Sequence, residues 1–214
     1  FRLFTVSLSM FAQSQRRRFI QMILGAMLLL PLGVSASMDM VEDQLRRAIV
    51  PDSSSEIWVL IDNQDSRLTV YRGGVELARY SPISVGRGGA KSQRVMGDKT
   101  TPRGEFHVNR FNFDSKFDIF IGLDYPTPTH ARMALETGLY SQQDYDDYFD
   151  YYRRHRSPPQ QTILGGYIGI HGVGDGDMDI HRNFDWTNGC VAVTNHEIRE
   201  LSGLIDVGTR VVIR

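Results

Sequence analysis

Short runs of β-branched and aromatic residues follow one another early in the chain, and they restrict its fold more than any other feature. They cover residues 57–62, 67–72 and 75–85, and turn-forming residues separate them at 63–66 and 73–74. Runs of this length and composition, interrupted in this way, are typical of strands joined by tight turns. We therefore predict a β-meander.

Weaker signals extend this pattern to the end of the chain. Strands are also expected at 105–109, 166–171, 190–193 and 206–213, and helices at 131–139 and at 197–204, the second opened by Asn195. The stretch 111–159 is otherwise irregular. Its tyrosine-rich part, 144–156, is interpreted as a solvated helix or lid without a catalytic role, with a substrate-covering flap as the alternative. The predicted fold class is mainly β with short helices, built as a β-sandwich or barrel-like sheet.

The amino-terminal segment carries the marks of an export signal. Arg16, Arg17 and Arg18 precede an apolar stretch at 19–34, and small residues follow at 34–36. The unbroken apolar core, 22–32, is shorter than the roughly 20 residues of a membrane-spanning helix, so a cleaved signal is favoured over a retained anchor. The arginines also resemble the twin-arginine export pattern, without its leading Ser/Thr and trailing Lys.

The expected organisation is one folded domain behind this signal. Residues 1–36 form the signal peptide, and residues 1–9 are read as upstream sequence because Met10 stands just before the basic cluster. Residues 37–56 form an amino-terminal helix, expected at 38–50, and a linker, and residues 57–214 form the folded domain. The predicted location is outside the cytoplasm, in the periplasm or cell envelope, with membrane contact only during export.

Composition excludes some partners. The formal net charge is −1, with 41% hydrophobic and 23% charged residues. A nucleic-acid or acidic-membrane partner calls for a concentrated basic face, which this balance does not suggest. The single cysteine, Cys190, cannot form an internal disulfide, and an exported chain tends to keep a spare thiol only where it has a use.

Cys190 and His171 together suggest nucleophilic chemistry. Cysteine attacks a carbonyl carbon as its thiolate and needs a base or a positive neighbour. The six histidines are His107, His130, His155, His171, His181 and His196. His171 ends an apolar strand before Gly172, and Cys190 begins the next expected strand, so adjacent strands could bring the two side chains together. Asn188-Gly189 can make the tight turn that orients backbone N–H groups toward an oxyanion. A buried, inert thiol is the alternative.

These residues resemble the signature of the L,D-transpeptidase catalytic domain, also called the YkuD-type domain. The matching elements are Ile170-His171-Gly172, the motif from Thr187 to Val191, and the upstream stretch 101–106, and the resemblance covers residues 57–214. It implies that Cys190 is the acyl-accepting nucleophile and His171 the proton donor and acceptor. Gly189 and Cys190 would supply oxyanion amides, with Thr187, Asn188 and Gly172 in the oxyanion and substrate-binding set.

Two positions depart from the commoner form of this pattern. Many members carry His where Asn188 stands and Arg where Ala192 stands. The form Asp-Trp-Thr-x-Gly-Cys at 185–190 is similar to a subgroup that includes hydrolases of a peptidoglycan linkage. The direction of the reaction is therefore left open.

The resemblance implies a role in peptidoglycan biosynthesis, cell-wall organisation and cell shape. A stem peptide would acylate Cys190 with loss of a D-amino acid, and the thioester would pass to a diaminopimelate amine, to a lipoprotein lysine, or to water. No cofactor is implied, and carbapenems are expected to acylate the cysteine. Arg87, Arg103 or Arg182 could hold a stem carboxylate, with solvated surface arginines as the equal alternative.

Two other readings are kept open. Asp175, Asp177, Asp179 and His181 alternate near His171 and could bind zinc in a peptidase, but their spacing matches no compact zinc motif and is typical of an exposed loop. No metal site is therefore predicted, and His181 is read by default as a loop histidine, with a position near the site as the alternative. A non-catalytic wall-binding module would retain affinity for peptidoglycan after loss of Cys190.

Overall fold

The computed structural model describes residues 41–214. The predicted signal peptide, and the part of the expected amino-terminal helix before residue 41, lie outside the described residues. A helix occupies residues 41–48. Within residues 41–214, no helix is both long enough and apolar enough to cross a membrane.

The predicted meander is present. Strands β1 (Ile57–Asp62), β2 (Arg67–Arg72) and β3 (Val75–Tyr80) pair antiparallel in chain order. The predicted continuation of the third strand to Val85 is wrong, because β3 ends at Tyr80 and is followed by Pro82, which has no backbone N–H to donate to a ladder.

The remaining strands extend this meander into one eight-stranded sheet. They are β10 (Arg210–Ile213), β6 (Gly104–Ser115), β7 (Asp118–Leu123), β8 (Gly169–His171) and β9 (Val191–Ala192). The strand order is β3-β2-β1-β10-β6-β7-β8-β9, and β8 and β9 run parallel to each other. Two short strands, β4 (Ala90–Lys91) and β5 (Thr101–Pro102), form a separate parallel pair.

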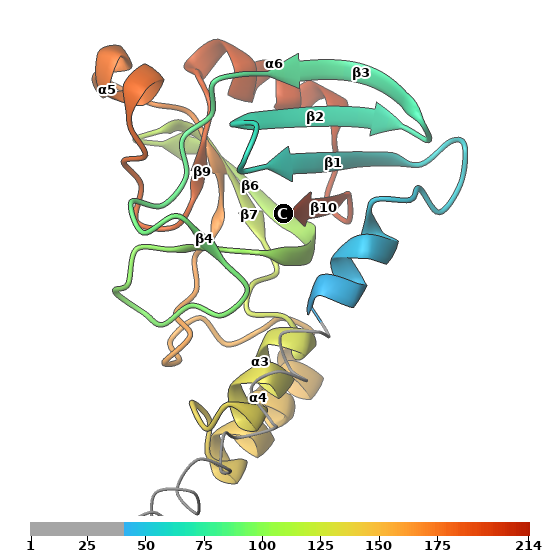
Figure 1. The fold of residues 1–214 in the computed structure, drawn as a ribbon, viewed down its shortest axis with the longest axis vertical. Coiled ribbons are helices and arrows are strands. Elements are labelled where there is room, and N and C mark those ends of the chain that lie inside the picture. Colours follow the sequence, from blue (N-terminus) through green and yellow to red (C-terminus); the bar gives the residue numbers. More distant parts are fainter. Residues whose placement is uncertain (1–40) are drawn as a thin grey trace, which may run out of the picture.

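Strand β6 joins the two halves of the sheet. Its first residues, Gly104 to His107, pair with β10, and its later residues, from Val108 to Ser115, pair with β7. The segment after β3 then approaches the opposite edge, since Ser84 and Ala192 exchange two backbone hydrogen bonds of 3.0 and 2.7 Å. The prediction of a mainly β, barrel-like fold with short helices is confirmed (Figure 1).

The β6–β7 hairpin is the largest error of the sequence interpretation. The strand expected at 105–109 runs to Ser115, and β7 lies within the stretch predicted to be irregular. Phe111 and Phe113 alternate with polar residues, which is a strand signal, but most of that part of β6 is exposed or half-buried and so lacks an apolar face.

Four labelled helices flank the sheet. Helix α3 (Pro128–Glu136) packs beside α4 (Gln142–His155) at one end of the molecule (Figure 1). Helix α6 (Asn195–Leu204) contacts β7 and β8, and the short α5 (Met178–Asn183) follows β8 in the chain. The tyrosine-rich segment is therefore a helix, as expected, and it begins with a capping box at Ser141.

One apolar core lies between the sheet and α6. Its largest fully buried side chains include Phe106, Ile121, Tyr125, Ile170 and Ile198. A second cluster joins the helix at 41–48 to the sheet through Trp58 and Val212.

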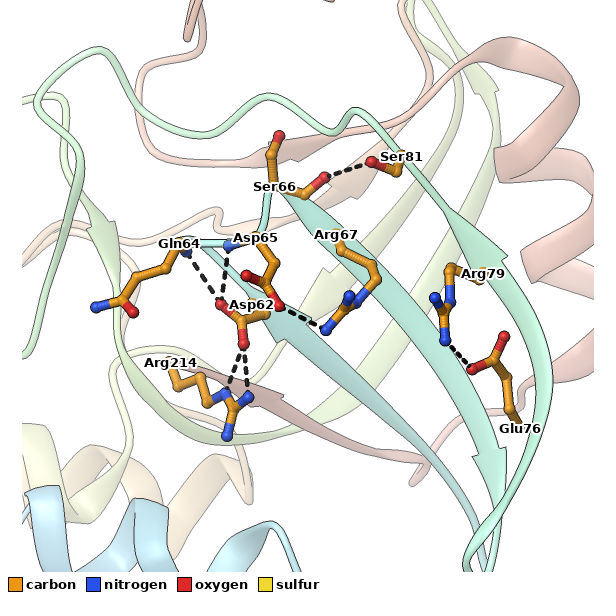
Figure 2. A network of polar contacts seen from close by, with 9 residues as sticks. All are labelled: Asp62, Gln64, Asp65, Ser66, Arg67, Glu76, Arg79, Ser81 and Arg214. Atoms are coloured by element: carbon orange, nitrogen blue, oxygen red, sulfur yellow. Dashed lines mark hydrogen bonds and ion pairs between the residues drawn. The ribbon is translucent and has the colours of Figure 1, made fainter.

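The β1–β2 turn is held by a carboxylate. Oδ1 of Asp62 accepts from the N–H groups of Gln64 and Asp65 at 3.0 and 3.1 Å, and Oδ2 accepts from Arg214 at 2.8 and 2.6 Å (Figure 2). The turn predicted from polar residues thus also anchors Arg214.

Candidate active site

Cys190 and His171 lie on neighbouring strands. Cys190 directly precedes β9, and the register of the parallel pair places Ile170 opposite Val191 and His171 opposite Ala192. Cys190 is thus level with Gly169. Alternate residues of a strand share a face, and Gly169 and His171 are two residues apart. The side chains of Cys190 and His171 therefore project from the same face of the sheet.

The His171 ring is fixed by its surroundings. Its Nδ1–H donates to the carbonyl oxygen of Gly172 at 2.7 Å, which leaves Nε2 as an acceptor. Phe117 stacks on the ring at 4.3 Å between centroids, and Trp186 meets it edge-on at 5.7 Å. Burial lowers the pKa of His171 to about 4, against the opposing effect of the Gly172 carbonyl and helped by His181 and Lys116. The imidazole is therefore neutral at pH 7 and able to accept a proton.

The Cys190 side chain is partly exposed, and its Sγ donates to the carbonyl oxygen of Tyr167 at 3.5 Å. Burial raises the pKa of the thiol above its ordinary value, outweighing the Gly169 amide and the charges of Arg94 and Arg110, which act in the opposite direction. The resting site therefore holds a neutral thiol beside a neutral imidazole.

Thr187 shapes the turn before the cysteine. Its Oγ1 donates to the carbonyl oxygen of Cys190 at 2.6 Å and accepts from the N–H of Gly189 at 3.1 Å. Gly189 has φ +131°, a conformation that side-chain-bearing residues rarely adopt. The Gly189 amide is thus already engaged within the turn.

The loop after β3 holds this turn from the outside. The backbone N–H of Thr187 donates to Val85, and that of Arg87 donates to the carbonyl of Thr187, at 3.2 and 3.1 Å. Asn188 accepts through Oδ1 from Nη2 of Arg87 at 2.9 Å.

A cavity of about 390 Å³ opens beside Cys190. It is lined by Arg94, Met96, Gly97, Lys99, Gly166, Tyr167, Ile168, Asn188 and Cys190. The lining combines apolar side chains and glycines with two cations, Arg94 and Lys99. This combination suits a peptide that bears a carboxylate.

Gly172 allows two segments to pack closely and is not among the residues that line the cavity. A Cβ at this position would lie 2.6 Å from the carbonyl oxygen of Phe117 and 2.7 Å from Oδ1 of Asn195. A side chain here would therefore clash with the backbone of Phe117.

The three arginines predicted as carboxylate-binding candidates have different surroundings. Arg103 pairs with Glu42 at 3.0 Å, and Arg182 pairs with Asp179 at 3.6 Å. Arg87 donates to Asn188, which lines the cavity. The arginine that lines the cavity itself, Arg94, was not identified from the sequence.

The residues considered for zinc have other contacts. Asp177 caps α5 by accepting from two backbone N–H groups, and Asp179 pairs with Arg182. The expectation that His181 is a loop histidine is wrong: it lies in α5, is 1% exposed, and its Nδ1 lies 3.2 Å from Oγ of Ser84. Residues 41–214 contain no cluster of three or more His, Cys, Asp or Glu side chains placed to hold a metal.

Helix α4 does not line the cavity beside Cys190. Tyr148 is buried and donates to the carbonyl of Pro126 at 2.7 Å, and the helix instead borders a separate cavity of about 530 Å³ with residues 159–163. The helix interpretation of the tyrosine-rich segment accounts for these contacts.

Comparisons with known proteins agree with this geometry. The family model of the L,D-transpeptidase catalytic domain, YkuD, matches residues 56–213. No curated protein matches the chain by sequence.

Solved structures share the fold at low identity. A point mutant of the helical cell shape determining protein Pgp2 from Campylobacter jejuni matches with TM-score 0.51 and 18% identity, over 86% of this chain and 57% of that one. Bdellovibrio bacteriovorus Bd1075 matches with TM-score 0.44 and 19% identity, over 77% and 50%. An L,D-transpeptidase from Xylanimonas cellulosilytica matches with TM-score 0.43 and 20% identity, over 77% and 63%. The chain thus spans 50% to 63% of these proteins' lengths.

Proposed function

Because the chain belongs to the L,D-transpeptidase catalytic domain family, we propose that it is a cysteine-dependent acyltransferase acting on peptidoglycan stem peptides. The observation that carries the proposal is the placement of Cys190 and a neutral His171 on neighbouring strands, with the cysteine on the wall of a cavity. The family acts in the cell envelope, which agrees with the predicted export signal.

The first step forms a thioester. Nε2 of His171 accepts the thiol proton as Sγ of Cys190 attacks the carbonyl carbon that precedes a D-residue. The carbon–nitrogen bond then breaks, and His171 returns the proton to the leaving amine. Since both groups start neutral, proton transfer accompanies the attack instead of preceding it.

The developing oxyanion needs backbone donors. We assign the amide of Cys190 to this role. The Gly189 amide donates to Thr187 in this structure, so it becomes a second donor only when that bond opens.

The second step transfers the acyl group. His171 accepts a proton from the incoming nucleophile as it attacks the thioester, and the thiol is regenerated. With a diaminopimelate amine the product is a cross-link, and with a lipoprotein lysine it is an anchored protein. With water the enzyme is a hydrolase, which is the alternative activity favoured by the Asp-Trp-Thr-x-Gly-Cys form of the motif at 185–190. A role in cell-wall organisation and cell shape follows from either activity.

The test is intact-protein mass spectrometry with disaccharide-tetrapeptide muropeptides, comparing the protein with its Cys190→Ala variant. Loss of D-alanine, with a thioester adduct and a dimeric product that both depend on Cys190, supports the transferase. Release of D-alanine with water-derived products alone supports the hydrolase. Equal turnover by Cys190→Ala contradicts both, and binding of peptidoglycan by both proteins without turnover identifies a wall-binding module.

A further inference from the structure

Arg94 is a buried cation next to the nucleophile. It is 5% exposed, and a Cβ built on Gly189 would lie 2.3 Å from its Nη1, so the guanidinium rests against the residue that precedes Cys190. On the other side, Nη2 lies 3.4 Å from a Cβ built on Gly165. The guanidinium carbon stands 5.7 Å from the centroid of the Tyr125 ring.

Most of its donors have no acceptor among the residues that the structure describes. A guanidinium has five N–H donors. Nη1 donates to the carbonyl oxygen of Thr100 at 3.1 Å, and Nε is buried without a partner. Within residues 41–214, the side chain forms no ion pair and this is its one hydrogen bond.

The acid nearest along the loop, Asp98, attracts Arg94 electrostatically but forms neither an ion pair nor a hydrogen bond with it. Oδ1 of Asp98 accepts from the N–H and the hydroxyl of Thr100, both at 2.8 Å, and Oδ2 accepts from the N–H of Val95 at 2.9 Å. Its carboxylate is therefore used to hold the loop around Arg94.

A buried cation without a directly bound anion is costly, and removing water strengthens its attraction for one. Arg94 also lines the cavity that contains Cys190. The missing partner is thus expected to come from whatever occupies that cavity, and a planar carboxylate matches the guanidinium in geometry and charge.

Building on the function proposed above, we propose that Arg94 binds the carboxylate of the D-residue that Cys190 expels. In such a substrate the carboxylate carbon is three bonds from the attacked carbonyl carbon, a separation of only about 3 to 4 Å. A guanidinium packed against Gly189 is therefore placed for this carboxylate, rather than for one further along the stem. The site would then require a free carboxy-terminal D-residue and would reject an internal or amidated one.

Two other cations close to the cavity are less suited to this role. Arg87 donates to Asn188 and is exposed, and Lys99 is also exposed on the cavity rim. Arg87 is therefore the matched control, since it is also an arginine and it contacts Asn188, which lines the same cavity.

The test measures binding without turnover. In the full chain carrying Cys190→Ser, calorimetry compares a tetrapeptide stem ending in D-alanine with its carboxamide. We expect the acid to bind about 10- to 100-fold more tightly. Adding Arg94→Gln should bring the ratio close to one, whereas adding Arg87→Gln should leave it unchanged. Arg94→Lys, which keeps the charge, should restore part of the preference, and it replaces Arg94→Gln if the latter does not fold by circular dichroism.

Three results would overturn the assignment: an unchanged ratio in folded Arg94→Gln or Arg94→Lys, loss of the ratio in Arg87→Gln alone, or no binding of either peptide. The proposed function is tested separately by thioester formation in the protein with Cys190 intact. If the acid is preferred but no thioester forms, the acyltransferase proposal is contradicted and the carboxylate site is not. If a thioester forms but the acid is not preferred, the carboxylate site is contradicted and the acyltransferase proposal is not.

Discussion

Replacing Gly189 by alanine should destabilise the protein and disable the site. The residue has φ +131°, and an added Cβ would lie 2.3 Å from Nη1 of Arg94 and 2.7 Å from the carbonyl oxygen of Thr100. The backbone conformation alone costs about 1–3 kcal/mol for a residue with a side chain. The Thr100 contact is with backbone, which cannot swing away, so we expect a total loss of about 2–4 kcal/mol in the free energy of unfolding. For a domain of this size that lowers Tm by roughly 4–16 °C.

Gly203 supplies a matched control. It lies near the end of α6, and a Cβ there would have no heavy atom within 4 Å. Alanine is a better helix former than glycine, so Gly203→Ala should gain about 0.5–1 kcal/mol. Thermal unfolding followed by circular dichroism should therefore shift in opposite directions for the same chemical change at the two glycines.

The catalytic effect follows from the same contact. Below its Tm, Gly189→Ala should form the thioester at least about 100-fold more slowly, because the oxyanion amide and Arg94 are both displaced. The reasoning is refuted if Gly189→Ala unfolds and reacts like the unmodified protein, or if Gly203→Ala loses as much stability.

Three further predictions concern other parts of the molecule. Because the pKa of Cys190 is raised, the thiol should be almost entirely protonated at pH 7, and alkylation by iodoacetamide should still rise as the pH is increased above 7; a plateau near pH 6 would instead indicate a thiolate–imidazolium pair with His171. Thr187→Val should cost about 1–3 kcal/mol in denaturant unfolding, since it removes both hydrogen bonds of the turn, and unchanged stability would contradict their role. The hydrogen bond from Arg210 lowers the pKa of Glu56, so that carboxylate stabilises the fold above its unfolded pKa of about 4.3 and loses this effect as the pH falls through its folded pKa. Glu56→Gln should therefore destabilise at pH 7 and flatten the acid dependence of Tm, and equal acid slopes would refute the coupling.

Much of the fold could be predicted because its signals are local. The meander follows from alternating apolar runs and from turn residues at 63–66 and 73–74, and the pairing partners lie close in the sequence. The helix opened by Asn195 is set by a capping box between Thr194 and Glu197, which is likewise local.

Signals failed where long-range contacts decide the structure. The later part of β6 is a strand because β7 pairs with it, although much of it is not buried. His181 has the sequence context of an exposed loop, yet packing of α5 against Ser84 buries it.

The sequence by itself determined the family, the mainly β architecture, and the identity of Cys190 and His171 as the reactive candidates, because each rests on residue types at fixed spacing. Tertiary structure decided the environment of those residues. It lowered the pKa of His171 through burial and engaged the Gly189 amide in a hydrogen bond to Thr187. It also placed Arg94 against Gly189, although the two residues are 95 positions apart in the sequence. Burial, charge compensation and close approach depend on which distant segments meet, and that information exists only once the sheet has closed.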